Sequence, residues 1–252
     1  YKRQPGFTAG MGKLHEDYGS MEWEQLLAPA VELAEEGFEL SEFLALRIEQ
    51  PDGAAATTQL EHYAPGGQPL VQGEDLVQEE LASTLQALQQ NGAEDLYTGE
   101  LAASLVEQVE GVDTESLADY EVLVTDPVRG EFGDRELIGP PPSLPGAPMI
   151  QMMQIAEANG ISEMEPGSAD YVDTLSQAWL VAEESVLNDI GDPNFVQVPV
   201  DEMTDPDANA QVDLSAHSGQ EPVASGEDAP NTTHISVVDD DGMAISMTNT
   251  IM

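Results

Sequence analysis

Cysteine is absent from this 252-residue chain, which excludes disulfides, thiolate metal sites and cysteine nucleophiles. Basic residues are scarce as well, because six Lys and Arg side chains stand against 49 Asp and Glu, giving a formal net charge of −43. Such a charge repels phosphate and anionic lipid, so nucleic acid is not an expected partner. The sequence also lacks any run of about 18 apolar residues, so no membrane span is expected.

Two explanations of the acidity compete. A highly charged chain of low hydrophobicity can stay disordered. Alternatively, the acidic residues cover a folded protein of a salt-loving organism, in which molar salt screens their repulsion. Apolar residues recur at helical spacing with acidic residues between them, which favours the folded halophilic protein. The chain starts at Tyr1 and stops at Met252 within an expected strand, so we expect a fragment; cytoplasmic and secreted locations both stay open.

The pattern of apolar residues, caps and breakers predicts a mostly helical chain with few strands. Ser20 and Ser41 are expected helix caps, Gly37 an expected helix end, and Pro51 an expected stop. A loop is expected over 52–69, and an exposed acidic linker over about 203–231. The expected helices cover 11–18, 20–37, 41–50, 78–91, 99–111, 114–118, 147–159 and 168–186, and the expected strands 121–128 and 136–139.

The most informative segment lies near the C-terminal end. A hydroxyl residue, Thr232, stands directly before a short apolar strand, the acidic turn 240–242 follows, and a second strand covers 243–251. With the turn at this place, Thr232 faces Asn249, Thr250 or Ile251 in the second strand. The hydroxyl of Thr250 is therefore expected within hydrogen-bonding reach of Thr232.

A threonine hydroxyl is a poor nucleophile unless a base takes its proton. Cleavage of the Asn231–Thr232 peptide bond would free the α-amino group of Thr232, whose ordinary pKa of about 7.7–8.0 suits a base near neutral pH. Threonine is also simply common in strands, and Thr233 is read as a strand residue. His234 is either a second base or a packed, hydrogen-bonded side chain, and the pattern leaves both open.

Further segments join the hairpin in a specific order. Pro5 to Gly10 resembles the Pro-Gly-Thr-Val-Ala-Gly segment of the γ-glutamyltranspeptidases, and the helical blocks 15–19, 28–30 and 33–38 are similar to theirs. Leu96 to Gly99 looks like the family's Phe-Tyr-x-Gly turn, and Pro140 to Ser143 like its Pro-Pro-Pro-Ser stretch. Gly191 to Phe195 matches Gly-Asp-Pro-x-Phe, and the hairpin 231–250 resembles the processing site of the same family.

This resemblance implies an N-terminal nucleophile hydrolase, an α+β fold in which two sheets lie between helical layers (αββα). The chain would hold the C-terminal part of the large subunit, 1–231, and the start of the small catalytic subunit, 232–252. The precursor would cut itself between Asn231 and Thr232. Thr232 would then take a γ-glutamyl group from glutathione or a related amide and pass it to water, an amino acid or a peptide. Thr250 would support the nucleophile, and no cofactor or metal is implied.

Three departures from the family pattern keep alternatives open. Met252 stands where the family usually has a substrate-contacting Asn. Ser143 is followed by Leu-Pro-Gly rather than Ser-Gly-Gly, and the family's Asp-Arg pair falls at Ser185 and Val186. A catalytically degenerate homologue that serves as a structural or ligand-binding protein, and an acylase of the same fold, are therefore the alternatives.

The remaining candidate sites are interpreted as structural rather than as binding or catalytic sites. The acidic cluster 201–207 is read as solvated linker rather than a cation site. A Met-rich helix supplies core filler, with Met149, Met152 and Met153 as its methionines. His62 and His217 receive no role.

Overall fold

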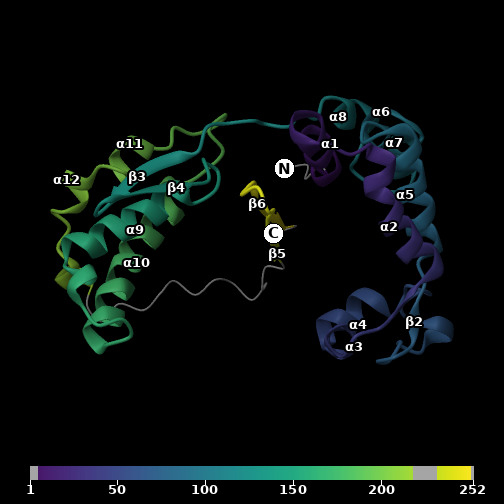
Figure 1. Cartoon of the computed structure of the whole chain (residues 1–252), viewed down its shortest axis with the longest axis horizontal. Helices are drawn as coiled ribbons and strands as arrows, with labels where there is room; N and C mark the ends of the chain where they lie inside the picture. Colours follow the sequence, from purple (N-terminus) through teal and green to yellow (C-terminus); the bar gives the residue numbers. More distant parts are fainter. Residues whose placement is uncertain (1–4, 218–231, 251–252) are drawn as a thin grey trace. The chain divides into compact units, whose positions relative to one another are not determined.

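The computed structural model describes residues 5–217 and 232–250. The chain forms two compact units, Tyr1–Leu123 and Val124–Met252. Helices predominate within the described residues, and the strands form three separate two-stranded antiparallel sheets (Figure 1).

The first unit is built on helices that pack in pairs, α2 against α5 and α6 against α7 and α8. A small apolar core gathers around the β1–β2 pair and α3, formed by Leu40, Ala45, Ile48, Leu70 and Leu76. The elements of this unit are α1 (Phe7–Tyr18), α2 (Trp23–Glu36), β1 (Phe38–Glu39), α3 (Glu42–Glu49), α4 (Pro51–Thr57), η1 (Pro65–Gly67), β2 (Asp75–Leu76), α5 (Glu79–Asn91), α6 (Asp95–Thr98), α7 (Glu100–Gln108) and α8 (Thr114–Ala118).

Most helix boundaries follow the predicted signals, although α1 begins at Phe7 rather than at residue 11 and α7 ends at Gln108 rather than at residue 111. Ser41 caps α3 by accepting a hydrogen bond from the Leu44 amide, and Gly37 ends α2 at a φ of 82°. Ser20, in contrast, is not a cap, because α2 begins only after Glu22. Pro51 follows α3 but also starts α4, inside the predicted loop, since proline suits the first turn of a helix. The described segment 121–127 forms no strand, although one was predicted there.

Tyr97 connects two segments that are far apart in the sequence. Its hydroxyl donates to the Pro5 carbonyl at 2.5 Å and accepts from the Ala9 amide at 3.0 Å, so it fixes the start of α1. Burial, opposed by the Ala9 hydrogen bond, raises the pKa of the Tyr97 phenol. Tyr97 of the Leu96–Gly99 turn therefore holds this turn against the Pro5–Gly10 segment.

The second unit is organised around α9, which contacts the β3–β4 hairpin and α10. Ile150 and Ile155 of α9 are fully buried, each in a separate apolar cluster. The elements are β3 (Val128–Phe132), β4 (Arg135–Gly139), α9 (Gly146–Ala158), η2 (Ile161–Glu163), α10 (Ala169–Asp189), α11 (Val200–Met203), α12 (Pro206–Asn209), η3 (Leu214–His217), β5 (Thr232–Val238) and β6 (Ala244–Thr250).

Gly146, at the start of α9, lies very close to the backbone of Gly139 and Pro140, and this close approach explains why the residue is a glycine. A Cβ placed on Gly146 would lie 2.0 Å from the Pro140 carbonyl oxygen and 2.9 Å from the Gly139 carbonyl carbon. These neighbours are backbone atoms, so the clash cannot be relieved by turning a side chain. Glycine at 146 therefore sets how closely the end of β4 packs on α9.

The first part of the predicted linker is packed rather than exposed. Met203, Asn209 and Leu214 are all buried, and α11 and α12 contact α9. The Asn209 amide donates to Gln154 Oε1 at 2.7 Å and to the Met203 carbonyl at 2.8 Å, while the Gln154 amide donates to the Thr204 carbonyl at 3.2 Å. A satisfied amide network therefore fixes this segment to α9. Residues 218–231 of the expected linker lie outside the described residues.

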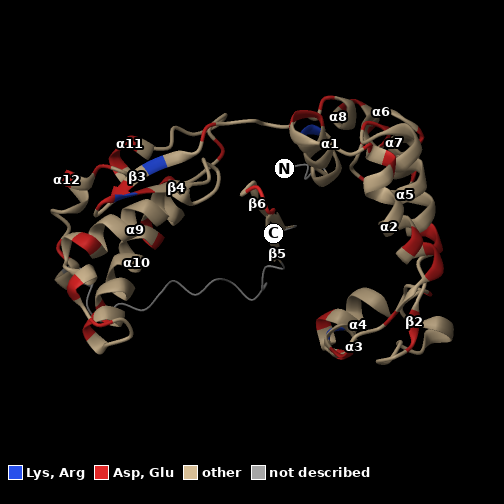
Figure 2. Cartoon of the chain, in the orientation of Figure 1, with Lys and Arg blue, Asp and Glu red and all other residues tan. Residues whose placement is uncertain are grey.

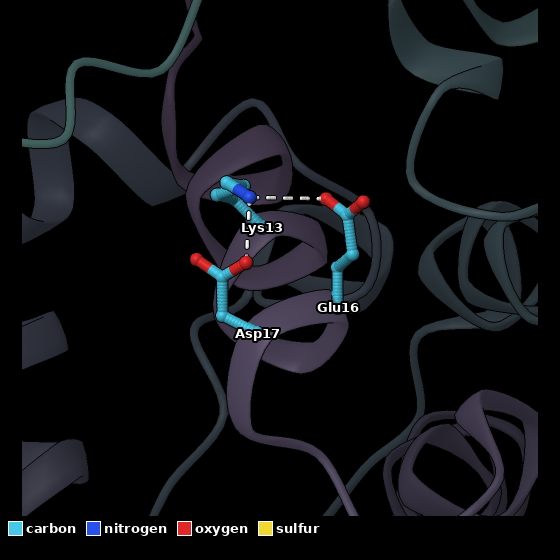
Figure 3. A network of polar contacts seen from close by, with 3 residues as sticks. All are labelled: Lys13, Glu16 and Asp17. Atoms are coloured by element: carbon cyan, nitrogen blue, oxygen red, sulfur yellow. Dashed lines mark hydrogen bonds and ion pairs between the residues drawn. The ribbon is translucent and has the colours of Figure 1, made fainter.

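Acidic residues are spread over the helices and loops of both units, whereas few Lys and Arg residues accompany them (Figure 2). Lys13 on α1 forms ion pairs with Asp17 at 2.6 Å and Glu16 at 3.3 Å (Figure 3), and these hydrogen bonds, first that of Asp17, raise the pKa of Lys13. Among the described residues, no helix is both long and apolar enough to cross a membrane.

Candidate active site

The β5–β6 hairpin brings the predicted hydroxyl residues together. Its turn has the Asp239 carboxylate accepting from the amides of Asp241 and Met243, and Gly242 adopts a φ of 87°. The resulting register pairs Thr232 with Thr250, His234 with Thr248 and Ser236 with Ser246. The pairing of Thr232 with Thr250 lies at the centre of the predicted range.

Thr232 and Thr250 meet at the open end of the hairpin. The Thr232 hydroxyl donates to the Thr250 hydroxyl, and 3.0 Å separates the two oxygens. All seven residues of β5 are exposed in the described structure, Thr232 among them. A second hydroxyl at this distance restricts the rotamers of the first and can stabilise charge on its oxygen.

His234 occupies the same face of the hairpin as Thr232. Its Nδ1 lies 2.8 Å from Thr248 Oγ1, and its Nε2 lies 3.1 Å from both Ser236 Oγ and Ser246 Oγ. The structure gives His234 a hydrogen-bonded position, which fits both roles left open by the sequence. The ring of hydroxyls around it was not predicted from the sequence. Serines and threonines at alternate positions of both strands were the available signal.

The other predicted residues lie in several places. Asn231 and Met252 fall outside the described residues. Ser185 is on α10, where its hydroxyl donates to Gln151 Oε1 at 2.8 Å, so it bridges α10 and α9. Met152 packs against the Ile155 cluster as expected for core filler, whereas Met149 is 39% exposed. Within 5–217 and 232–250, no three His, Asp or Glu side chains are grouped as a metal site.

Comparison with known proteins finds one family that matches nearly the whole chain. A family model described as gamma-glutamyltranspeptidase matches residues 4–252. The capsule biosynthesis protein CapD proenzyme of Bacillus anthracis is 29% identical over 247 residues, covering 98% of this chain and 46% of the relative. The glutathione hydrolase proenzyme of Escherichia coli (strain K12) is 29% identical over 264 residues, with 98% and 45% covered.

The fold has a matching solved structure. The crystal structure of Helicobacter pylori gamma-glutamyltranspeptidase aligns with a TM-score of 0.77 and 26% identity, covering 88% of this chain and 65% of that one. The chain spans about half the length of the curated relatives it matches. Those relatives therefore contain a comparable length of chain with no counterpart in these 252 residues.

Proposed function

The chain belongs to the γ-glutamyltranspeptidase family, and from this membership we propose that Thr232 is the nucleophile of a γ-glutamyl transferase or hydrolase. The observation that carries the proposal is the 3.0 Å contact between the Thr232 and Thr250 hydroxyls. The proenzyme and glutathione hydrolase names of relatives support it. The donor would be glutathione or a related γ-glutamyl amide.

Maturation would begin with cleavage of the peptide bond that precedes Thr232. This cut would divide the precursor into a large subunit that ends at Asn231 and a small subunit that begins at Thr232. The freed α-amine, with an ordinary pKa of about 7.7–8.0, is partly neutral near pH 7 and can accept a proton. The same residue would then supply both nucleophile and base.

Turnover would follow in two steps. The Thr232 oxygen attacks the γ-carbonyl of the donor, its proton passes to the α-amine, and the leaving amine departs with that proton. A γ-glutamyl ester on Thr232 remains. Water or the amino group of an amino acid or peptide then attacks this ester and regenerates the hydroxyl. Thr250 would hold the Thr232 oxygen in the attacking rotamer through the hydrogen bond between their hydroxyls.

Trapping the acyl-enzyme tests this proposal. The full-length protein, purified in high salt, would be mixed with a γ-glutamyl anilide, quenched with acid and digested. We expect release of the aniline and a γ-glutamyl adduct on the peptide that begins at Thr232. Aniline release with the adduct on another residue would contradict the assignment of Thr232, and a protein that releases no aniline would favour the degenerate homologue.

A further inference from the structure

One face of the β5–β6 hairpin is polar over the three residue pairs farthest from the turn, and the apolar pair Val238–Ala244 follows on the same face next to the turn. Directly opposed residues of an antiparallel pair share a face, and so do alternate residues of one strand. The other face carries Thr233, Asn249 and the apolar side chains of Ile235, Val237, Ile245 and Met247. The polar face is formed by the successive pairs Thr232–Thr250, His234–Thr248 and Ser236–Ser246.

The imidazole of His234 has hydroxyl partners at both ring nitrogens, Thr248 at Nδ1 and the two serines at Nε2. A hydroxyl can donate as well as accept, so these partners suit either neutral tautomer and also the protonated ring. The ring can therefore gain and lose a proton while its neighbours only rotate their O–H bonds. A structural histidine needs one fixed tautomer, whereas a proton carrier needs this tolerance.

Self-cleavage needs a proton acceptor that later turnover does not need. Before the cut, the nitrogen of Thr232 belongs to a peptide bond, and its lone pair is delocalised into the carbonyl. It cannot serve as the base for the reaction that releases it. The carboxylates at the hairpin turn, from Asp239 to Asp241, are seven or more residues along the strand, roughly 23 Å away. Among the described residues of the hairpin, His234 is the titratable side chain nearest to Thr232.

We infer that His234 accepts the Thr232 proton during self-cleavage, through the hydroxyl of Thr248 or one bridging water. This inference rests on the proposed function. Alternate residues on one strand lie about 6.7 Å apart, a separation that one hydroxyl or water spans. His234 thus acts one pair along the polar face from the Thr232–Thr250 pair.

The step balances as an N-to-O acyl shift followed by hydrolysis. The Thr232 oxygen bonds to the carbonyl carbon of Asn231, and its proton passes to His234. The C–N bond then breaks, and protonated His234 returns the proton to the departing nitrogen, which becomes the α-amine. One water hydrolyses the new ester, leaving a carboxylate on Asn231 and a free hydroxyl on Thr232.

The test follows self-cleavage of the full-length precursor on gels over time, in molar salt. We compare the wild type, His234→Gln, His234→Ala and Thr232→Ala, with His62→Gln as the matched control because His62 lies on the first unit. General-base catalysis contributes about 10²–10⁴-fold. We expect both His234 variants to cleave at least about 10²-fold more slowly. Free imidazole should accelerate His234→Ala but not Thr232→Ala, and His62→Gln should cleave at the wild-type rate.

Two further readouts separate proton transfer from a structural role. A structural role would lower the unfolding temperature and would reduce self-cleavage and turnover together, with no response to imidazole. Proton transfer would slow self-cleavage far more than turnover measured per cleaved subunit. The inference is overturned if either His234 variant cleaves within about threefold of the wild type, or if imidazole has no effect. A wild-type precursor that stays uncut would instead overturn the proposed function itself.

Discussion

Replacing Thr250 by valine removes one hydroxyl from the candidate site while the shape of the side chain and its suitability for a strand are retained. The lost contact is the 3.0 Å hydrogen bond from Thr232. A hydrogen bond of this kind contributes about 0.5–1.5 kcal/mol net. Because about 1.4 kcal/mol corresponds to a factor of ten in rate, we expect kcat/KM to fall about 2- to 12-fold.

The assay is γ-glutamyl anilide turnover by the cleaved full-length enzyme, corrected for the fraction that has cleaved. Thr250→Ser keeps a hydroxyl and should retain most of the activity. Thr233→Val is the matched control, because Thr233 pairs with Asn249 on the opposite face, and it should stay within about twofold. If Thr250→Val turned over as fast as Thr250→Ser, the reasoning that the hydroxyl pair positions the nucleophile would be refuted.

Three other predictions follow from the fold and the charge. Gly146→Ala should lower the unfolding free energy by about 3 kcal/mol or more in denaturant titration, because the new Cβ meets backbone at Pro140. Gly10→Ala should be tolerated, because a Cβ there meets nothing within 4 Å beyond its chain neighbours and the backbone of its own helix. Equal stability of the two variants would contradict the packing argument. Since burial raises the pKa of Tyr97, the folded state holds the phenol proton more tightly, so stability should fall as pH rises above about 10. Tyr97→Phe should show a weaker decline of stability with pH. An unchanged decline would refute the assignment of this pH dependence to Tyr97. The net charge of −43 predicts that the urea midpoint rises steeply with KCl and that structure is lost at low salt, whereas salt-independent unfolding would count against a halophilic protein.

The hairpin was predictable because its register depends on local features. Side chains alternate with a period of two, and the Asp-Asp-Gly turn fixes where the count begins, so Thr232 could be paired with Thr250 from the sequence. Solved relatives confirm the N-terminal nucleophile hydrolase fold, to which the described part of this chain contributes helices and three two-stranded sheets. The structure also explains one motif that carried the resemblance, because Tyr97 of the Leu96–Gly99 turn binds the backbone of Pro5 and Ala9.

The errors arose where distant parts of the chain decide the outcome. The described segment 121–127 has strand-like residues but no partner strand pairs with it, so its propensity is not realised. The first part of the expected linker has a polar composition, yet Asn209 and Met203 are buried. The Asn209 amide donates to Gln154, 55 residues earlier, and to the Met203 carbonyl. Composition alone does not reveal such a partner.

The most direct test of the account is the N-terminus of the small subunit. We predict that intact-mass measurement and N-terminal sequencing of the full-length protein, purified in molar salt, will find a fragment that begins at Thr232. Thr232→Ala should remain a single uncut chain without γ-glutamyl turnover. A Thr232→Ala protein that still matures and turns over its donor, or a wild type that is active while uncut, would contradict the central claim.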